Sequence, residues 1–122
     1  MQHCVIHNLS EPGRAPIQAQ VAETFWNRFK GLMLRRQIGS TEALLIDESR
    51  DSRVNTAIHM LFMNFDICAI WINEKLEVVD VKIAKKWSLS HIPIKPARYI
   101  LEASPDRYQD FQPGNLLTFT YD

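Results

Sequence analysis

Short segments rich in β-branched and other apolar residues recur along the chain, and residues typical of turns separate them. Several segments alternate apolar with polar side chains, which is the period of a strand with one buried face. The pattern predicts about eight strands. They are expected at residues 3–8, 16–23, 42–47, 54–62, 67–73, 76–83, 97–103 and 116–122.

One stretch has the period of a helix instead. Phe25, Phe29 and Leu32 fall at i, i+4 and i+7, and Thr24 can cap the first turn, so a helix is predicted over 24–36. Strands do not alternate with further helices, so the predicted class is α+β and mainly β. We expect antiparallel or mixed strands curled into a barrel-like sheet, with one short helix packed at its side.

Length and charge limit the organisation of the chain and its partners. With 122 residues the chain has the size of one domain, so residues 1–122 are expected to form a single domain with one core. Fourteen basic residues balance fourteen acidic ones, so no net field attracts polyanions. Neither nucleic acid nor a membrane is therefore expected as a partner.

Two segments bear on the cellular location. The first twenty residues lack a positive region followed by an apolar region, so no secretory signal is predicted. The apolar stretch from Ile58 to Ile72 is interrupted by His59, Asn64 and Asp66, and it is shorter than the roughly 20 residues of a membrane span. The chain is therefore expected in the cytoplasm.

Neither a metal nor a cofactor is expected. Cys4 and Cys68 lie in apolar strand-like segments without the spacing of a zinc site, so we interpret them as buried, reduced thiols. In a strand, His3 and His7 project to the face opposite Cys4. A metal there would lack its third and fourth ligands.

Arg28, Gly31 and Arg35 share one edge of the predicted helix. Two guanidinium groups beside a bare backbone patch can clamp an anion or a carboxylate ligand. The alternative is structural, because arginine stems can cover the edge of a core while their charged groups pair with acids such as Glu102.

His59, Met63 and Asn64 lie where one apolar segment bends toward the next. A histidine among apolar neighbours can act as a general base, because its unperturbed pKa is about 6.5. More often it is a core histidine with satisfied hydrogen bonds, and no serine or cysteine nucleophile with a third orienting residue is visible by spacing. No residue is therefore assigned a catalytic role, and enzymatic activity is left open.

Three stretches share a pattern with known proteins: FWNRFKGLMLRR (25–36), IHMLFMNFDICAIWIN (58–73) and PIKPARYILEA (93–103), followed by a Pro-Gly-Asn turn at 113–115. The most specific part is the R-x-x-G-L-M-x-R motif of the first stretch. Over about residues 16–120 the chain resembles the domain-of-unknown-function 192 (DUF192) family. The resemblance implies a compact, mostly β, barrel-like domain with a short helix and no assigned biochemical role.

The chain departs from that family at the central bend. Similar proteins read Met-Arg-Phe-Pro-Ile-Asp, where this chain reads Met-Asn-Phe-Asp-Ile-Cys at 63–68. Cys68 then stands in place of an aspartate, and Asp66 in place of a proline. A site built on the family aspartate would need Asp66 to serve instead.

Three functions fit these observations. The first is an accessory module that binds a small molecule or a protein through a polar patch of Arg28, Gly31, Arg35, His59, Met63, Asn64 and Glu102. The second is a small hydrolase or isomerase with His59 as general base and an arginine that stabilises charge. The third is an interaction subunit of a larger assembly, which would expose an apolar patch with Trp87, Ile92 or Ile94.

Overall fold

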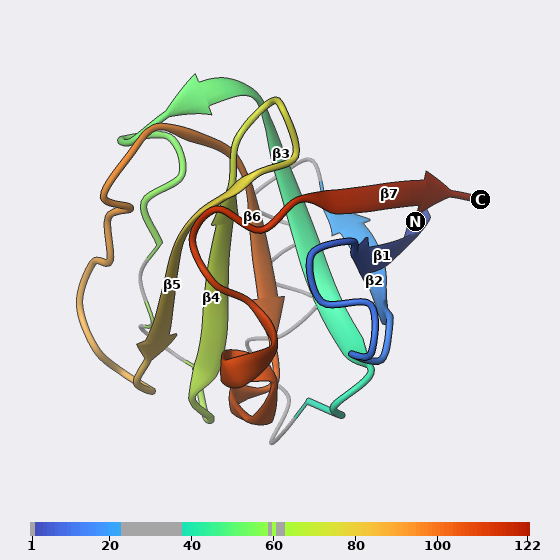
Figure 1. The fold of residues 1–122 in the computed structure, drawn as a ribbon. Helices are drawn as coiled ribbons and strands as arrows, with labels where there is room; N and C mark the ends of the chain where they lie inside the picture. Colours follow the sequence, from blue (N-terminus) through green and yellow to red (C-terminus); the bar gives the residue numbers. More distant parts are fainter. Residues whose placement is uncertain (1, 23–37, 59, 61–62) are drawn as a thin grey trace.

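The computed structural model describes residues 2–22, 38–58, 60 and 63–122 (Figure 1). The described chain contains strands and one short 3-10 helix. They are β1 (His3–Asn8), β2 (Ile17–Ala22), β3 (Glu42–Ser52), β4 (Ile67–Ile72), β5 (Val78–Ala84), β6 (Ala97–Ala103), the helix η1 (Pro105–Asp110) and β7 (Leu117–Tyr121). The helix predicted over 24–36 lies outside the described residues.

The strands form one mixed sheet with the order β5-β4-β6-β3-β2-β1-β7. β2 and β3 run parallel, and the other neighbours in the sheet are antiparallel.

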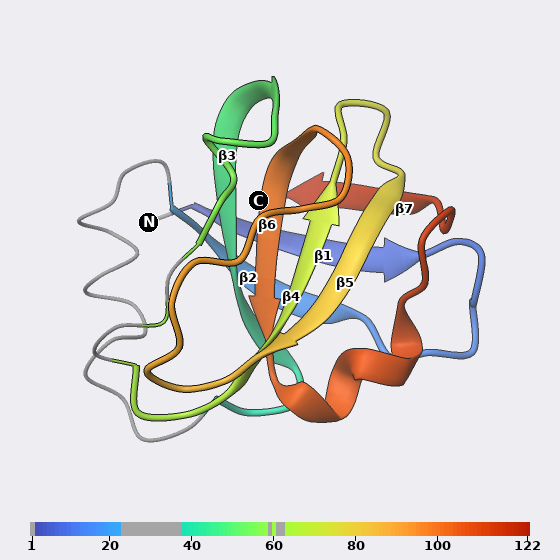
Figure 2. The same cartoon turned by 90° about the vertical axis from the view of Figure 1, so that its left-hand side faces the viewer.

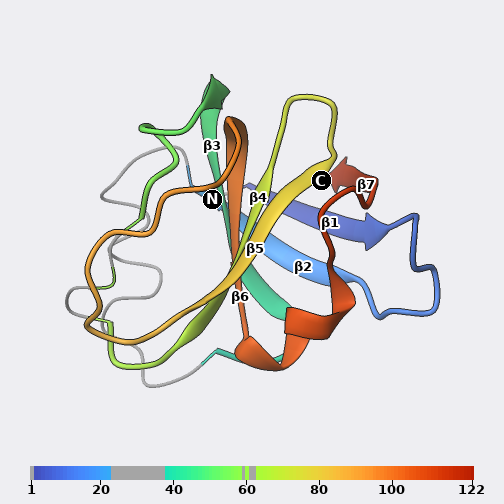
Figure 3. The same cartoon turned by 60° about the vertical axis from the view of Figure 1, so that its left-hand side comes forward.

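The sheet curls until its two edges approach each other at one end (Figure 3). The Leu117 amide donates to the Leu76 carbonyl, and the Val78 amide donates to the Asn115 carbonyl, both at 2.9 Å. Gly114 makes the tight turn before β7 with φ 95°, a conformation that favours glycine. The predicted mainly β, mixed and barrel-like fold is confirmed.

Apolar side chains cover both faces of the central strands. One core cluster includes Ile6, Ile70 and Leu101, and a second cluster, on the opposite face, includes Trp71 and Ile100. β4 lies between the two clusters, and all of its residues are buried. The burial of both faces explains why residues 67–72 are apolar without alternation.

The second face is covered by a segment that we predicted to be a strand. Residues 54–62 were expected to pair in the sheet, but in the described part of this segment only Ile58 forms a bridge, with His91. Its described apolar residues Ile58 and Met60 pack in the second core cluster. The indole Nε1 of Trp71 donates to the Thr56 carbonyl at 2.7 Å, and both residues are fully buried. For the described residues of this segment, the strand prediction is wrong.

β3 is longer than the predicted strand at 42–47. It continues to Ser52 through a register shift after Asp47, and Ser49 adopts φ 72° there. The charged residues after 47 are predicted from the sequence to form a turn at 48–53. They remain in the strand because its end lies at the surface, where polar side chains meet water.

A buried arginine fixes η1 to the sheet. Arg107 is 5% exposed. Its Nη1 donates to the Ser40 carbonyl at 2.7 Å, its Nη2 donates to the Ala15 carbonyl, and its Nε contacts Asp110 Oδ2 at 2.5 Å. The segments around residues 15 and 40 are thereby held against the helix.

Candidate functional site

The residues predicted to bind a ligand divide into two sets. The structure describes Met63, Asn64 and Glu102, and it places them near one end of the sheet, around β4 and β6. The other predicted residues lie outside the described part of the chain and stay predictions: Arg28, Gly31, Arg35 and His59.

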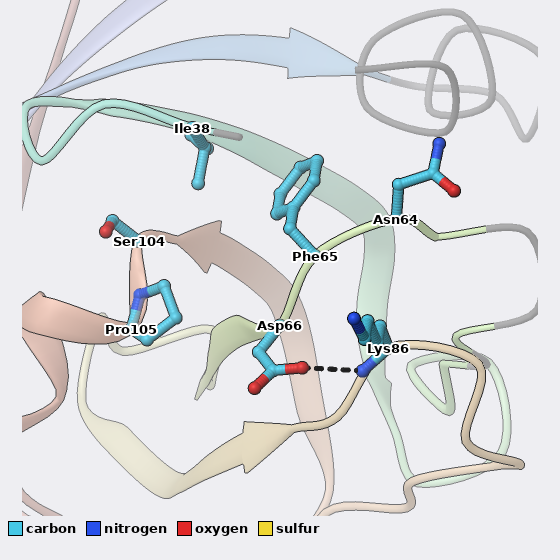
Figure 4. A pocket seen from close by; sticks show the side chains of 7 residues that line it. All are labelled: Ile38, Asn64, Phe65, Asp66, Lys86, Ser104 and Pro105. Carbon is cyan, nitrogen blue, oxygen red and sulfur yellow. Dashed lines mark hydrogen bonds between the residues drawn. The ribbon is translucent and has the colours of Figure 1, made fainter. Parts of the chain in front are cut away.

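A cleft of about 440 Å³ opens at this end of the sheet (Figure 4). β4 runs antiparallel to both of its neighbours, so its first residue lies beside the ends of β5 and β6. The chain that enters β4 and the chains that leave β5 and β6 therefore meet there. Side chains of these segments line the cleft, together with Ile38 from the segment before β3: Ile38, Asn64, Phe65, Asp66, Lys86, Ser104 and Pro105.

Asp66 is the charged acceptor of the cleft. Its Oδ1 accepts a hydrogen bond from the backbone amide of Lys86 at 2.8 Å, and its Oδ2 lies 3.4 Å from Lys85 Nζ. The Lys86 hydrogen bond, helped by both lysine charges, lowers the pKa of Asp66 below its ordinary value. Asp66 is therefore an ionised carboxylate with a fixed orientation at neutral pH.

The structure distinguishes between Asp66 and Cys68, which were the two positions in question at the central bend. Cys68 is fully buried in the cluster on the face opposite Trp71, and burial raises the pKa of its thiol to about 12. Asp66 lines the cleft. Of these two residues, only Asp66 can present a charged group to the cleft, because it lies just before β4 and not within it.

Met63 and Glu102 are buried and are not among the described residues that line the cleft. Met63 is 2% exposed and packs in the second core cluster. Glu102 is fully buried in β6, where it pairs with Leu44 of β3 and Ala69 of β4. A carboxylate in such apolar surroundings must be hydrogen-bonded or paired, and Glu102 does have an interaction partner. A ligand role for either residue stays a prediction.

Asn64 is exposed and lines the cleft, as a ligand-binding residue must. Lys86 and Ser104 also line it, but sequence reasoning did not select them for this site. Ser104 is 8% exposed and precedes η1 without a hydrogen bond from its side chain to the helix. The signal that could have found both is positional, since each follows a predicted strand by one to three residues.

A serine–histidine contact was also missed. Ser88 Oγ lies 2.8 Å from His91 Nε2 in the loop between β5 and β6, and Ser88 Oγ donates to the Lys85 carbonyl at 2.6 Å. Because the hydroxyl proton is used by that carbonyl, His91 Nε2 must be the donor to Ser88. Burial and the Lys82 charge lower the pKa of His91. The pair fastens the loop and does not have the arrangement of a nucleophile and its base.

Neither a metal-binding cluster nor a membrane-spanning helix is found among the described residues. No group of three His, Cys, Asp or Glu side chains there could hold a metal ion. In the same part of the chain, no helix has the length and apolar content needed to span a membrane. Both cysteines are free and buried, as the sequence predicted.

Comparison with known sequences identifies close relatives. The model of the DUF192 family, described as "Uncharacterized ACR", matches residues 7–119. A UPF0127 protein of Thermococcus kodakarensis is 39% identical over 105 residues, which are 84% of this chain and 65% of that protein. A UPF0127 protein of Pyrococcus furiosus is 34% identical over 95 residues, which are 78% of each chain. The chain thus spans less than two thirds of the length of the Thermococcus relative.

Two solved structures share the fold. A proposed transcription regulator of Sinorhizobium meliloti superposes with a TM-score of 0.80 at 20% identity, over 97% of this chain and 92% of that one. A protein of unknown function from Novosphingobium aromaticivorans gives a TM-score of 0.77 at 17% identity, over 95% and 83%. At these identities the likeness concerns the fold alone.

Proposed function

The chain belongs to the DUF192 family, and from that premise we propose that it is an accessory module that binds a small polar molecule in the cleft at the start of β4. The carrying observation is the ionised, oriented carboxylate of Asp66 at the junction of three strand ends. A cleft of about 440 Å³ is within the range of small-molecule sites.

The composition of the cleft supports a ligand with both polar and apolar parts. Phe65, Ile38 and Pro105 supply apolar walls. Asp66 and Lys86 supply opposite charges, and the Lys86 side chain forms no ion pair with any described residue. A small molecule can bind both charged side chains if it carries an amino or hydroxyl group for Asp66 and an acidic group for Lys86.

Binding without catalysis is the function that the described residues support best. None of the described residues that line the cleft is a histidine or a cysteine, and none of them is a nucleophile paired with a base. The hydrolase or isomerase hypothesis depends on His59, which lies outside the described residues and stays a prediction.

A thermal-shift screen with amino acids, hydroxy acids, nucleotides and sugars tests the proposal. A ligand at a hundred times its Kd adds about 2.7 kcal/mol, which raises Tm by roughly 10 °C for a domain of this size. We expect Asp66→Asn and Lys86→Gln to abolish the shift. Arg28→Ala and Arg35→Ala, run beside them, test whether the predicted arginines share the site.

Lys85→Gln is the matched control. Lys85 forms the ion pair with Asp66 but does not line the cleft, so its removal leaves the carboxylate available to a ligand. The proposal fails if no compound shifts the wild-type protein. It also fails if the shift persists in Asp66→Asn, or if Lys85→Gln removes the shift as completely as Asp66→Asn does.

A further inference from the structure

The neutral net charge of the chain conceals a local excess of positive charge. From residue 81 to residue 101 there is no Asp or Glu, and five cationic residues are present: Lys82, Lys85, Lys86, Lys95 and Arg98. Lys82, Lys85 and Arg98 form salt bridges with acids that lie outside this stretch. Lys86 and Lys95 are exposed and form no salt bridge with a described residue. Their charges are therefore available to a partner.

Large apolar side chains are exposed in the same region. They are Val54 (80% exposed), Leu89 (75%), Ile94 (69%), Trp87 (53%) and Ile92 (46%), which we call the apolar ridge. Arg53 Nε donates to the Pro93 carbonyl at 3.0 Å, so the segment with Val54 lies against the loop with the other four. This loop, residues 85–96, lies on the side of the molecule away from β7 (Figures 1 and 3).

The loop that carries the ridge is fixed, although it has no regular secondary structure. The Trp87 amide donates to the Met60 carbonyl at 2.9 Å, and the Ile94 amide donates to Asp80 Oδ2 at 2.9 Å. His91 exchanges two backbone hydrogen bonds with Ile58. Trp87 adopts φ 63°, which is unfavourable for a bulky residue and persists only where the surroundings impose it. The ridge is thus held outward.

We infer that the apolar ridge attaches the protein to an anionic lipid surface. Apolar side chains can enter the boundary between headgroups and acyl chains while Arg53, Lys86 and Lys95 contact lipid phosphates. Trp87 suits this boundary because its ring is amphipathic. The attachment is peripheral and needs no spanning helix.

A lipid surface fits the ridge better than a protein partner does. A standard protein interface uses about 20–30 residues a side with matched shapes. The ridge has five apolar residues, and its most exposed side chains protrude from the surface. A fluid lipid surface accepts separate protruding side chains without a matching socket.

Co-sedimentation with vesicles tests the inference. We expect the protein to bind phosphatidylcholine vesicles that contain phosphatidylglycerol, to bind pure phosphatidylcholine vesicles much less, and to dissociate as salt is raised. In a Trp26→Phe background, Trp87 fluorescence should shift to the blue on binding, and Trp87→Phe should remove this shift, because the remaining Trp71 is already fully buried. The variant Leu89→Ser with Ile94→Ser should bind about tenfold more weakly or worse.

Leu9→Ser with Leu116→Ser is the matched control. These leucines are 58% and 48% exposed, and the turn after β1 lies on the side of the molecule opposite the loop at 85–96 (Figure 2). The control should bind vesicles like the wild type, whereas Lys86→Gln with Lys95→Gln should weaken binding to the anionic vesicles. Far-UV circular dichroism checks that each variant is folded.

Three outcomes would overturn the inference. One is no binding of the wild type to anionic vesicles. Another is an equal loss of binding in the control and ridge variants. The third is self-association in solution, without vesicle binding, that Leu89→Ser with Ile94→Ser abolishes. That result would assign the ridge to a second copy of the chain.

Discussion

Replacing Arg107 with methionine should be the most damaging single change at η1. Methionine keeps most of the apolar stem but removes the guanidinium, which leaves the carbonyls of Ser40 and Ala15 without their donor and Asp110 without its main partner. Breaking a buried ion pair by removing one partner costs about 3–5 kcal/mol. We expect Arg107→Met to lower the free energy of unfolding by that amount.

Urea unfolding at pH 7, followed by far-UV circular dichroism, measures the loss as a lower midpoint at an unchanged m-value. Arg14→Met is the control, because Arg14 contacts the same acid at 3.3 Å but its side chain is 46% exposed. Such an exposed pair contributes about 0–1 kcal/mol. Asp110→Asn added to Arg107→Met should recover part of the loss, since it removes a mostly buried charge that has lost its main partner. Equal losses in Arg107→Met and Arg14→Met would refute the reasoning.

Further expectations concern Asp66, Gly114 and the two cysteines. Because the pKa of Asp66 is lowered in the folded state, the stabilisation from its carboxylate is present above the unfolded pKa of about 3.9 and is lost as the pH falls through the folded pKa. The free energies of unfolding of wild type and Asp66→Asn should therefore converge in acid. A constant difference down to pH 2 would contradict this. Gly114→Ala meets no neighbouring atom but retains φ 95°, so it should cost about 1 kcal/mol in urea unfolding. Burial raises the pKa of Cys4 to about 11 and that of Cys68 to about 12, so a thiol reagent at pH 8 should label both only as fast as the protein unfolds.

The sequence was sufficient for strands whose local pattern decides their structure. β1 and β6 coincide with the predicted segments at 3–8 and 97–103. Residues 54–62 were misassigned because an apolar composition is needed equally for pairing inside a sheet and for packing on top of it. The contact of Thr56 with Trp71 distinguishes packing on top of the sheet from pairing inside it.

The cleft shows a second limit of sequence reasoning. Asn64 was predicted because it lies where one apolar segment bends toward the next, whereas Lys86 and Ser104 reach the same cleft only because β4 is antiparallel to two neighbours. Strand order and register come from long-range pairing, which no local pattern specifies. The exposed residues at Trp87, Ile92 and Ile94 were named in advance, but their exposure required the structure.

The pairing of β1 with β7 has a consequence for synthesis of the protein. The His3 amide reaches Asp122 Oδ1 across 119 positions of the sequence, so the first strand meets its outer neighbour only after the last one has been made. Until then one edge of β1 has open hydrogen-bonding groups and can pair with other chains. The sheet should therefore be completed only once residues 117–121 are available, with the slow kinetics typical of long-range pairing, and a nascent chain stalled before residue 117 should be prone to aggregate.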